Sequence, residues 1–303
     1  MIRQGTSYGI LLRALAALCF SLMTACMKWA SMIESVSAGE MVFYRSLFGL
    51  PVVLFWIFSR GEGLAAITTR RPLVHLWRCG LGVSGILLIF EGLKHLSLAD
   101  ATTIGFTAPI FATLLSIVLL SEQVGRHRWA AIAVAFLGVV VVLRPGMEGA
   151  PSLVGLLLAL SGAFVAASVT VTLRQLGKTE STTSIVFWFF VACCVVGGTI
   201  SLFNGHAHSL TGYGVLAVGG LAGGLAQLLM TSSLRHAPVS TLAPLDYLQM
   251  VGAVLLGWAL FSDVPTLTTL TGAGLIAASG LYTAWRERVR RREVTPPAPN
   301  ASV

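Results

Sequence analysis

The stretch that decides the fold is Gly92–Glu122, GLKHLSLADATTIGFTAPIFATLLSIVLLSE, because its pattern returns 141 residues later in Ser233–Asp263, SLRHAPVSTLAPLDYLQMVGAVLLGWALFSD. Matched residues at this offset include Lys94 with Arg235, His95 with His236, Ala112 with Ala253, Leu114 with Leu255, Ser121 with Ser262 and Glu122 with Asp263. Nearer the N-terminus the offset is about 144 and pairs Phe20 with Phe164. Solenoid proteins repeat units of roughly 20–50 residues. A unit this long therefore predicts a duplicated domain.

The composition indicates that this domain lies in a lipid bilayer. Hydrophobic residues make up 55% of the chain, charged residues make up 11%, and the mean hydropathy is +0.84. An ordinary soluble domain has about 25% charged residues, and a helix needs roughly 20 apolar residues to cross the hydrocarbon core. Ten such stretches are present, at about 9–29, 40–59, 73–93, 99–120, 129–144, 152–173, 183–203, 213–234, 240–261 and 267–285. The sequence predicts an all-α membrane protein with ten transmembrane helices.

The basic residues predict how these helices are oriented, because Lys and Arg near the ends of spans stay on the cytoplasmic side. With a cytoplasmic N-terminus, that side holds Arg3, Arg13, Arg60, Arg70, Arg71, Arg78, Arg126, Arg128, Arg174, Lys178, Arg235, Arg286, Arg288, Arg290, Arg291 and Arg292. The other side holds only Lys28, Lys94 and Arg144, and Arg45 lies inside a span. Both termini are therefore expected in the cytoplasm, with the protein in a bacterial inner membrane. The net charge of +8 follows from this bias and does not indicate a nucleic-acid partner.

Five spans in each half mean that the second half enters the membrane in the opposite sense from the first. We expect two inverted five-helix repeats, residues 1–146 and 147–286, followed by a basic, Pro-rich cytoplasmic tail at 287–303. Inverted repeats of this kind are typical of secondary transporters, in which the two halves enclose a site near the middle of the membrane. The architecture favours transport but does not by itself prove it.

Ionisable side chains within membrane spans are costly and usually functional, and the second span, with its sequence GEMVFYRSLFGL, contains three candidates. Arg45 has two interpretations: a cavity residue that binds a substrate carboxylate through its forked donors, or a structural arginine that ties helix ends together. Glu40 and Tyr44 lie one turn apart on one side of the same helix. Glu40 is interpreted either as a proton carrier or as a cap at the membrane interface.

The ninth span, with the sequence APLDYLQMVGAVLLGW, contains a denser polar group. Asp246 and Gln249 are three residues apart and share a helix face, Tyr247 flanks them, and Pro244 interrupts the helical hydrogen bonds just before. Two interpretations of Asp246 are open, a site residue or a cap at the start of the helix that follows Pro244.

The fourth span is the counterpart of the ninth and shows the same combination of polar residues and a helix break. Asp100, Thr103 and Thr107 form one stripe, and Pro109 follows. Broken helices at corresponding positions in two halves are the best sequence indication of a transport site. Weaker candidates are Gln227 in the eighth span and, in the third span, Ser84 and Glu91.

Three segments resemble the EamA-type members of the drug/metabolite transporter superfamily. LADATTIGFTAPIFATLLSIVLLSEQVGRHRWAAIAVAFLGVVVVLRPG is similar to the signature of the fourth and fifth helices, and APLDYLQMVGAVLLGWALFSDVPTLTTLTGAGLIAASGLYTAWRER to its second copy. EMVFYRSLFGLP is similar to the second-helix pattern, with its arginine at Arg45. The resemblance covers nearly the whole chain. It implies ten helices, a central cavity that opens to each side in turn, and small polar metabolites as substrates.

The chain departs from the family pattern at one helix end. Glu122, which ends the fourth helix, is Asp263 in the second copy, and Ser121 and Ser262 stand where the family usually has glycine. We interpret these positions as shaping the helix end.

The resemblance also limits the substrate to a few classes. We favour export of an amino acid or an amino-acid-derived compound, such as an opine-type metallophore, and the alternative is uptake of S-adenosylmethionine or riboflavin. Arg45 together with Asp246 would suit a zwitterion. If transport is driven by protons, one carboxylate among Glu40, Glu91, Asp100 and Asp246 must carry the proton, with Asp246 as the first choice. Exchange or facilitated diffusion is the alternative, and the sequence does not encode the oligomeric state.

A membrane-embedded enzyme is the remote alternative, and the sequence gives it no support. HExxH, GxSxG and Walker motifs are absent, as is any Cys or His pair at metal-ligand spacing within a span. We therefore expect no cofactor, no metal and no self-contained ATP-driven pump. His206 and His208 form an HAH sequence in an outer loop, interpreted as a solvated loop in preference to a surface ion site.

Overall fold

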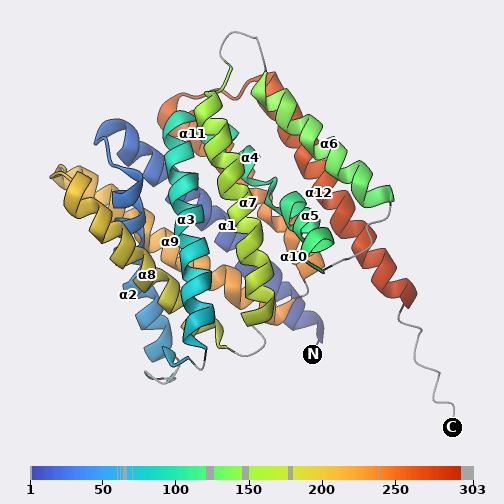
Figure 1. The fold of residues 1–303 in the computed structure, drawn as a ribbon, viewed down its shortest axis with the longest axis horizontal. Helices are drawn as coiled ribbons and strands as arrows, with labels where there is room; N and C mark the ends of the chain where they lie inside the picture. The colour runs from blue at the N-terminus through green and yellow to red at the C-terminus, as the bar shows by residue number, and fades with distance from the viewer. Residues whose placement is uncertain are drawn as a thin grey trace.

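The computed structural model describes residues 2–59, 61, 63, 67–69, 71–120, 126–144, 150–176, 180–237 and 239–294. Within these ranges the regular structure is entirely helical (Figure 1). The helices are α1 (Ile2–Ile33), α2 (Ala38–Ser59), α3 (Pro72–His95), α4 (Leu98–Gly105), α5 (Ala108–Leu120), α6 (Arg126–Leu143), α7 (Leu153–Leu176), α8 (Thr182–Asn204), α9 (Leu210–His236), α10 (Val239–Asp246), α11 (Leu248–Phe261) and α12 (Leu267–Val294).

Each of the ten predicted stretches carries one helix or a broken pair of helices. The pair α4 and α5 occupies the fourth stretch, and the pair α10 and α11 occupies the ninth. Within the described residues, seven segments are long and apolar enough to cross a membrane, and two shorter apolar segments are Leu98–Ala112, which includes the break between α4 and α5, and Trp129–Leu143. The predicted class, an all-α multi-pass membrane protein, is confirmed. Ser121 and Glu122, at the predicted end of the fourth helix, lie outside the described residues.

Serine side chains fix the start of several helices. Ser97, Ser181 and Ser209 each accept a hydrogen bond at 3.0 Å from the backbone N–H three residues later, at the first turns of α4, α8 and α9. This N-cap satisfies one of the backbone donors that a helix start leaves free. The last helix is longer than predicted, because α12 continues to Val294 and so includes eight residues of the predicted tail. Its RERVRRRE sequence is rich in good helix formers.

The two broken helices differ in where the proline lies. Pro109 is the second residue of α5, just after the break at Phe106 and Thr107, where a missing N–H costs little. Pro244 lies inside α10, and the break follows three residues later at Tyr247. Asp246 is consequently the last residue of α10, and Tyr247 is the N-cap of α11. The interpretation of Asp246 as a cap at the start of a helix is therefore wrong.

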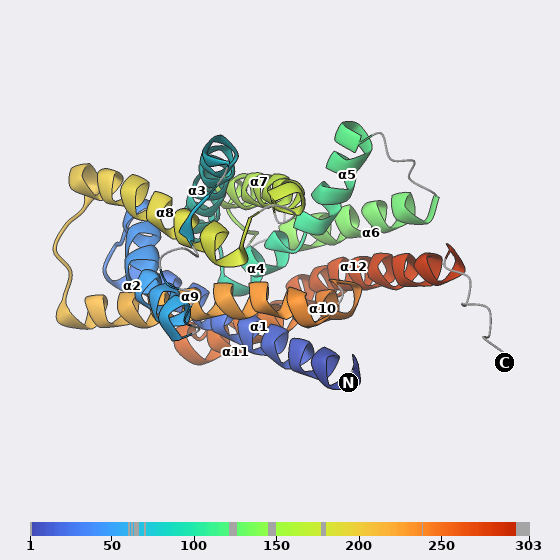
Figure 2. The same cartoon turned by 90° about the horizontal axis from the view of Figure 1, so that it is seen from below.

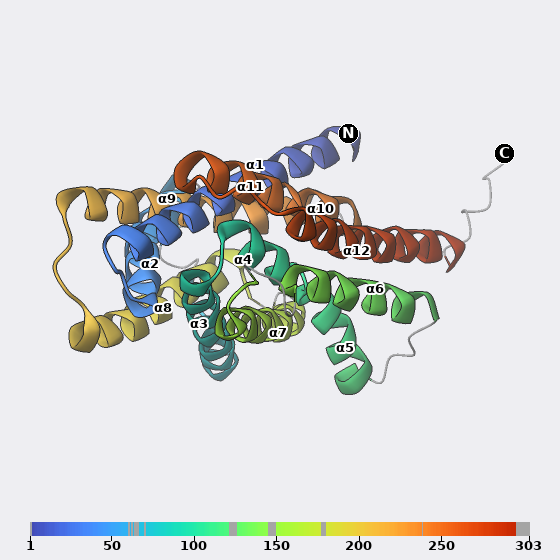
Figure 3. The ribbon, with the colours of Figure 1, turned by 90° about the horizontal axis from the view of Figure 1, so that it is seen from above.

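The helices form two layers, which Figures 2 and 3 show from opposite sides. One layer contains α1, α9, α10 and α11, and the other contains α3, α5, α7 and α8. The main packing pairs are α1 with α9, α3 with α7, α6 with α12, and α2 with both α8 and α9. Glycines allow the closest approach: a Cβ on Gly224 of α9 would lie 2.8 Å from the Cα atom of Gly49 in α2. Large apolar side chains such as Phe55 and Leu202 face outward, as expected for a surface in lipid.

Candidate functional site

Arg45 lies in the interior of the helix bundle. It is the eighth residue of α2 and only 2% exposed. Its Nε donates to the Sδ atom of Met23 in α1 at 3.1 Å, and its Cζ lies 5.2 Å from the ring centroid of Phe190 in α8. The Nη1 atom has no hydrogen-bond partner in the described part of the chain. Arg45 is thus held by a sulfur atom and aromatic rings, which leaves part of its guanidinium group free to bind a ligand.

Arg78 is a second buried arginine, and the sequence analysis missed it. It is the seventh residue of α3 and 3% exposed, although it was assigned to the cytoplasmic side with the other basic residues. Its Cζ lies 4.2 Å from the centroid of Phe189, and its Nε and Nη1 atoms lack partners among the described residues. The available signal was its apolar setting, because Arg78 stands between Trp77 and Cys79 in an otherwise hydrophobic run.

The two arginines face a common aromatic side chain. The Cζ of Arg45 is 5.8 Å from the Phe189 centroid, so both guanidinium groups lie within 6 Å of the same ring. Over the described ranges, neither arginine forms an ion pair with a carboxylate. The nearby hydroxyl of Ser46 is also buried without a partner. Two buried like charges without a counter-charge are costly. An anionic group that accepts from both would remove that cost, and planar carboxylates fit guanidinium donors well.

Asp246 forms an ion pair with a different arginine, Arg13. Both of its oxygens accept from Arg13 in α1, at 2.5 Å from Nε to Oδ1 and 2.7 Å from Nη2 to Oδ2. Arg45 contacts α1 at Met23, which is ten residues and about 15 Å further along the helix than Arg13. The structure therefore does not bring Arg45 and Asp246 together, and in this conformation they cannot hold the two ends of one small zwitterion.

The polar stripe of α4 has a mainly structural setting. Asp100 is buried, accepts from the Oγ1 of Thr269 in α12 at 2.7 Å and lies 3.9 Å from Nη2 of Arg144. The Oγ1 of Thr107 donates to the carbonyl oxygen of Ile104 at 2.7 Å. Thr103 is buried with its hydroxyl unpartnered in the described structure. Of the stripe, Thr103 alone offers a free polar atom, while Asp100 links α4 to α12.

The remaining candidates are the three weaker ones and Gln249 of the ninth span. Ser84 is on the exposed face of α3, and its Oγ donates to the carbonyl oxygen of Leu81 in its own helix. Glu91 is half-exposed and pairs with Lys94 at 3.0 Å. Gln227 and Gln249 are half-buried. Ser84 and Glu91 thus lie on a different face of α3 from the buried Arg78.

Glu40 belongs to a polar network at one end of the molecule. Its Oε2 accepts from the N–H and the hydroxyl of Ser37, both at 2.9 Å, which makes a capping box at the start of α2. Its Oε1 accepts from the N–H of His206 at 3.3 Å and lies 3.0 Å from Nε2 of His208. The Tyr44 ring packs edge-on against His208, with centroids 6.2 Å apart. Glu40 therefore caps the start of α2, which agrees with the second of its two interpretations.

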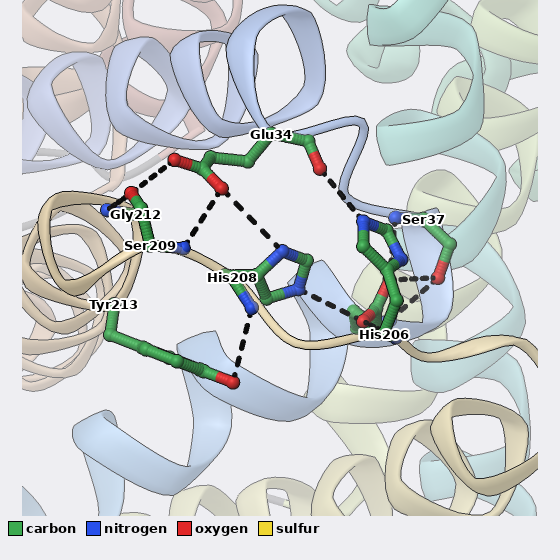
Figure 4. A network of polar contacts seen from close by, with 8 residues as sticks. Glu34, Ser37, His206, His208, Ser209, Gly212 and Tyr213 are labelled. Carbon is green, nitrogen blue, oxygen red and sulfur yellow. Dashed lines mark hydrogen bonds and ion pairs between the residues drawn. The ribbon is translucent and has the colours of Figure 1, made fainter.

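Glu34 joins the same network from the turn between α1 and α2, as Figure 4 shows. It accepts from the hydroxyl of Ser209 and, at 3.1 Å, from the Ser209 N–H. These two hydrogen bonds hold the pKa of the Glu34 carboxyl below its ordinary value. The interpretation of the HAH sequence as a solvated loop holds for His206, which is exposed, and is wrong for His208, whose side chain is fully buried.

A second His–Glu contact lies at the opposite end of the bundle. Nε2 of His75, near the start of α3, is 3.4 Å from Oε2 of Glu180, and both side chains are buried. Glu180 comes just before α8, and His206 comes just after it. The 23 residues of α8 separate the two contacts by about 34 Å. A contact between a histidine and a carboxylate from distant segments therefore lies at each end of the bundle.

The sequence matches a known family along both of its halves. The model of the EamA-like transporter family matches residues 7–144 and again residues 153–284. The chain belongs to the EamA-like transporter family. A crystal structure of another protein covers 95% of this EamA transporter with a TM-score of 0.67. The two sequences are 18% identical, so the likeness shows a shared fold.

Three relatives align with most of the EamA transporter described here. The pseudopaline exporter CntI of Pseudomonas aeruginosa is 30% identical over 273 residues, which is 89% of this chain and 94% of the exporter. The riboflavin transporter of Rhizobium johnstonii is 30% identical over 287 residues, or 94% and 93% of the two chains. The S-adenosylmethionine uptake transporter of Rickettsia felis is 28% identical over 254 residues, or 82% and 83%. The expected family and a transport function are thus confirmed.

Proposed function

We propose that this protein is a secondary transporter that exports a small, carboxylate-bearing metabolite and binds its carboxylate between Arg45 and Arg78. The observation that carries this proposal is the pair of buried guanidinium groups beside Phe189, which have unpartnered nitrogens and no acidic partner in the described structure. Buried polar groups are normally hydrogen-bonded. A carboxylate would supply both the missing acceptors and the missing negative charge.

The substrate class follows from this charge and from the relatives. An exporter of pseudopaline and an importer of S-adenosylmethionine are among them, and we favour an amino-acid-derived compound of the opine type. Export is favoured because the pseudopaline exporter is 30% identical over most of both chains. Import of riboflavin is the second candidate, because the riboflavin transporter is equally similar. Riboflavin lacks a carboxylate, so the two candidates make different demands on Arg45 and Arg78.

The architecture that we propose is two inverted repeats, residues 1–146 and 147–286, in a bacterial inner membrane with both termini in the cytoplasm. Three observations support it. The family model matches each half once, and the helix breaks fall in the corresponding fourth and ninth spans. The packing pair α1–α9 becomes the pair α7–α3 when each helix is replaced by its counterpart in the other half, and both pairs are observed. Finally, α1 begins at the end of the molecule marked N, and its counterpart α7 begins at the opposite end (Figure 1).

Alternating access in this architecture requires each end of the bundle to open in turn. The contacts of Glu34 and Glu40 with the α8–α9 loop would have to break for outward opening, and the His75–Glu180 contact for inward opening. If a proton gradient drives the cycle, Asp246 stays our first choice as proton carrier. It lies at a helix break and is 34% exposed beside Arg13.

Transport into proteoliposomes tests this function. Purified protein would be reconstituted, and movement of a labelled opine, S-adenosylmethionine and riboflavin would be measured with and without an imposed pH gradient. We expect the opine to move and riboflavin not to move. Movement of riboflavin alone would overturn the proposed substrate class, and a lack of transport for all carboxylate compounds would overturn the role of the arginines. A rate that ignores the pH gradient would exclude proton coupling.

A further inference from the structure

The strongest feature outside the proposed substrate site is the histidine and carboxylate cluster between the α1–α2 turn and the α8–α9 loop. Glu40, His206 and His208 each offer one ligand atom, and these three atoms all lie within 4.8 Å of one another. The cluster joins two segments that are more than 160 residues apart in the sequence, and Figure 4 shows both histidine rings turned toward the start of α2. The substrate proposal uses none of these three side chains as a ligand.

His208 lies between two carboxylates. Its side chain is fully buried, with Nε2 3.0 Å from Oε1 of Glu40 and Nδ1 3.9 Å from Oε2 of Glu34. Nδ1 has no hydrogen-bond partner among the described residues. A neutral imidazole carries a single N–H, so it can donate to only one of the two carboxylates that face it. A metal ion bound at this cluster would place a positive charge beside both carboxylates.

The far side of each ring is arranged as metal-binding histidines usually are. Histidine ligands commonly direct their second ring nitrogen to a carbonyl or carboxylate oxygen, which fixes the orientation of the ring. Nε2 of His206 lies 2.9 Å from the carbonyl oxygen of Glu34, and Nδ1 of His208 faces the Glu34 carboxylate. Glu34 is itself held by Ser209. Glu34 thus holds the His206 ring by a hydrogen bond and places a carboxylate oxygen 3.9 Å from Nδ1 of His208. The other two ring nitrogens, Nδ1 of His206 and Nε2 of His208, are the ones that would bind a ligand.

We propose that Glu40, His206 and His208 form a binding site for a divalent transition metal ion of the Zn²⁺ type. Two imidazoles and a carboxylate are a ligand set that suits zinc and similar ions better than magnesium or calcium. Ligands at about 2.0–2.1 Å from a tetrahedral zinc lie about 3.3 Å apart, close to the 3.0 Å between His208 Nε2 and Glu40 Oε1. All three ligand atoms lie within 4.8 Å of one another, and an inward movement of the exposed His206 ring would bring them to ligand distances. Water would complete the coordination.

The metal would act as a clamp on this end of the transporter. Glu40 begins α2, whereas His206 and His208 precede α9, so one ion would bind both segments to each other. From the sequence no metal is expected here, because the HAH sequence lies in a loop between spans and is interpreted as solvated. The third ligand comes from Glu40, which is 166 residues from His206, and only the fold brings it near.

Metal binding by the full-length protein tests the site directly. The protein would be purified in detergent with a tag that contains no histidine, stripped with a chelator, and dialysed against Zn²⁺ with elemental analysis of the bound metal. Co²⁺ titration would report the coordination geometry from its visible absorption. We expect one Zn²⁺ per chain in the wild type and at least about tenfold weaker Zn²⁺ binding in His206→Ala. Changing even the residues that hydrogen-bond to metal ligands weakens metal binding by about 10–100-fold, so losing a ligand should cost at least as much.

Two further variants separate metal binding from folding. Glu40→Gln keeps a side chain that can complete the capping box but loses the anionic ligand, so it should bind Zn²⁺ weakly and unfold at nearly the wild-type temperature. His95→Ala is the matched control, since His95 is an exposed histidine 3.6 Å from Glu91 without a third ligand, and it should bind as the wild type does. The site is disproved if the wild type takes up no stoichiometric Zn²⁺, or if His206→Ala and Glu40→Gln both bind like the wild type.

Discussion

Phe106 and Tyr247 stack on each other with ring centroids 4.9 Å apart and an angle of 29° between the rings. Phe106 follows the last residue of α4, and Tyr247 precedes the first residue of α11, so the stack joins the breaks of the two interrupted spans. The hydroxyl end of Tyr247 reaches Gly280 in α12, where a Cβ atom would collide with it. Any movement of one half against the other must therefore shift or break this aromatic contact.

The contact with Gly280 gives a prediction about stability. Gly280→Ala should lower the free energy of unfolding by about 1–3 kcal/mol, the usual cost of overpacking, because the new methyl group meets the Tyr247 hydroxyl. Tyr247→Phe in the same chain removes that hydroxyl and should restore most of the loss. Thermal unfolding in detergent measures both effects. Gly274→Ala, in the same helix with open space around it, is the control, and equal losses at both glycines would contradict the proposed contact.

The ion pair between Arg13 and Asp246 predicts non-additive mutations. Asp246→Asn and Arg13→Gln should each lower the free energy of unfolding by about 1.5–3 kcal/mol, the range for hydrogen bonds to charged groups, because each leaves one charge unpaired. The double variant should lose less than the sum, since neither charge then remains. A double-mutant cycle measured by thermal unfolding checks this. Additive losses would show that the two side chains do not interact.

The close contact of α9 with α2 predicts opposite effects at two glycines of one helix. Gly224→Ala should destabilise the protein, because its Cβ would lie 2.8 Å from both Cα and the carbonyl oxygen of Gly49. Gly214→Ala meets no atom within 4 Å, and it should stabilise by up to about 1 kcal/mol through helix propensity alone. Unfolding temperatures of the two variants decide the point. Stabilisation by both would contradict the packing of α9 on α2.

The orientation predicts how reporter fusions behave. A reporter that is active only in the cytoplasm should work when fused after Arg292 or in the loop between Arg60 and Arg71, and it should fail when inserted near His206. A reporter active only outside should show the reverse. An external Arg292 fusion would require an odd number of spans, and the proposed inverted repeats would then have to be abandoned.

The sequence predicted the helices well because hydrophobic stretches of spanning length are a local property. It also predicted both breaks, since the effect of proline on a helix is local as well. For Pro109 the predicted break is confirmed directly before the proline, whereas after Pro244 the helix continues to Asp246. At the second break Tyr247 contacts Phe106 and Gly280, which lie in other parts of the chain and which the local sequence does not indicate.

The candidate site was harder to predict, because its pairings join distant parts of the chain. Arg13 and Asp246 are 233 residues apart, and no pattern in a single sequence links them. Arg78 lies within two turns of the start of α3, where a basic residue usually marks the membrane interface. Its burial depends on Phe189 of α8. Arg45 was recognised as a candidate, but its relation to Arg78 appears only when α2, α3 and α8 are packed together.

The role of the paired arginines is tested most directly by measuring transport and stability together in Arg45→Gln and Arg78→Gln. Removing a buried, unpaired charge should leave the free energy of unfolding unchanged or raise it. The transport rate should fall at least about tenfold, which is equivalent to losing about 1.4 kcal/mol of substrate binding. Arg71→Gln, at an exposed position before α3, is the control.

Counterflow of a labelled opine in proteoliposomes gives the transport rate, and thermal unfolding of the same preparations gives the stability. We predict that both variants are stable and inactive, and that Arg71→Gln is stable and active. Stable variants that transport at the wild-type rate, or variants that lose stability in proportion to activity, would contradict a carboxylate site between Arg45 and Arg78.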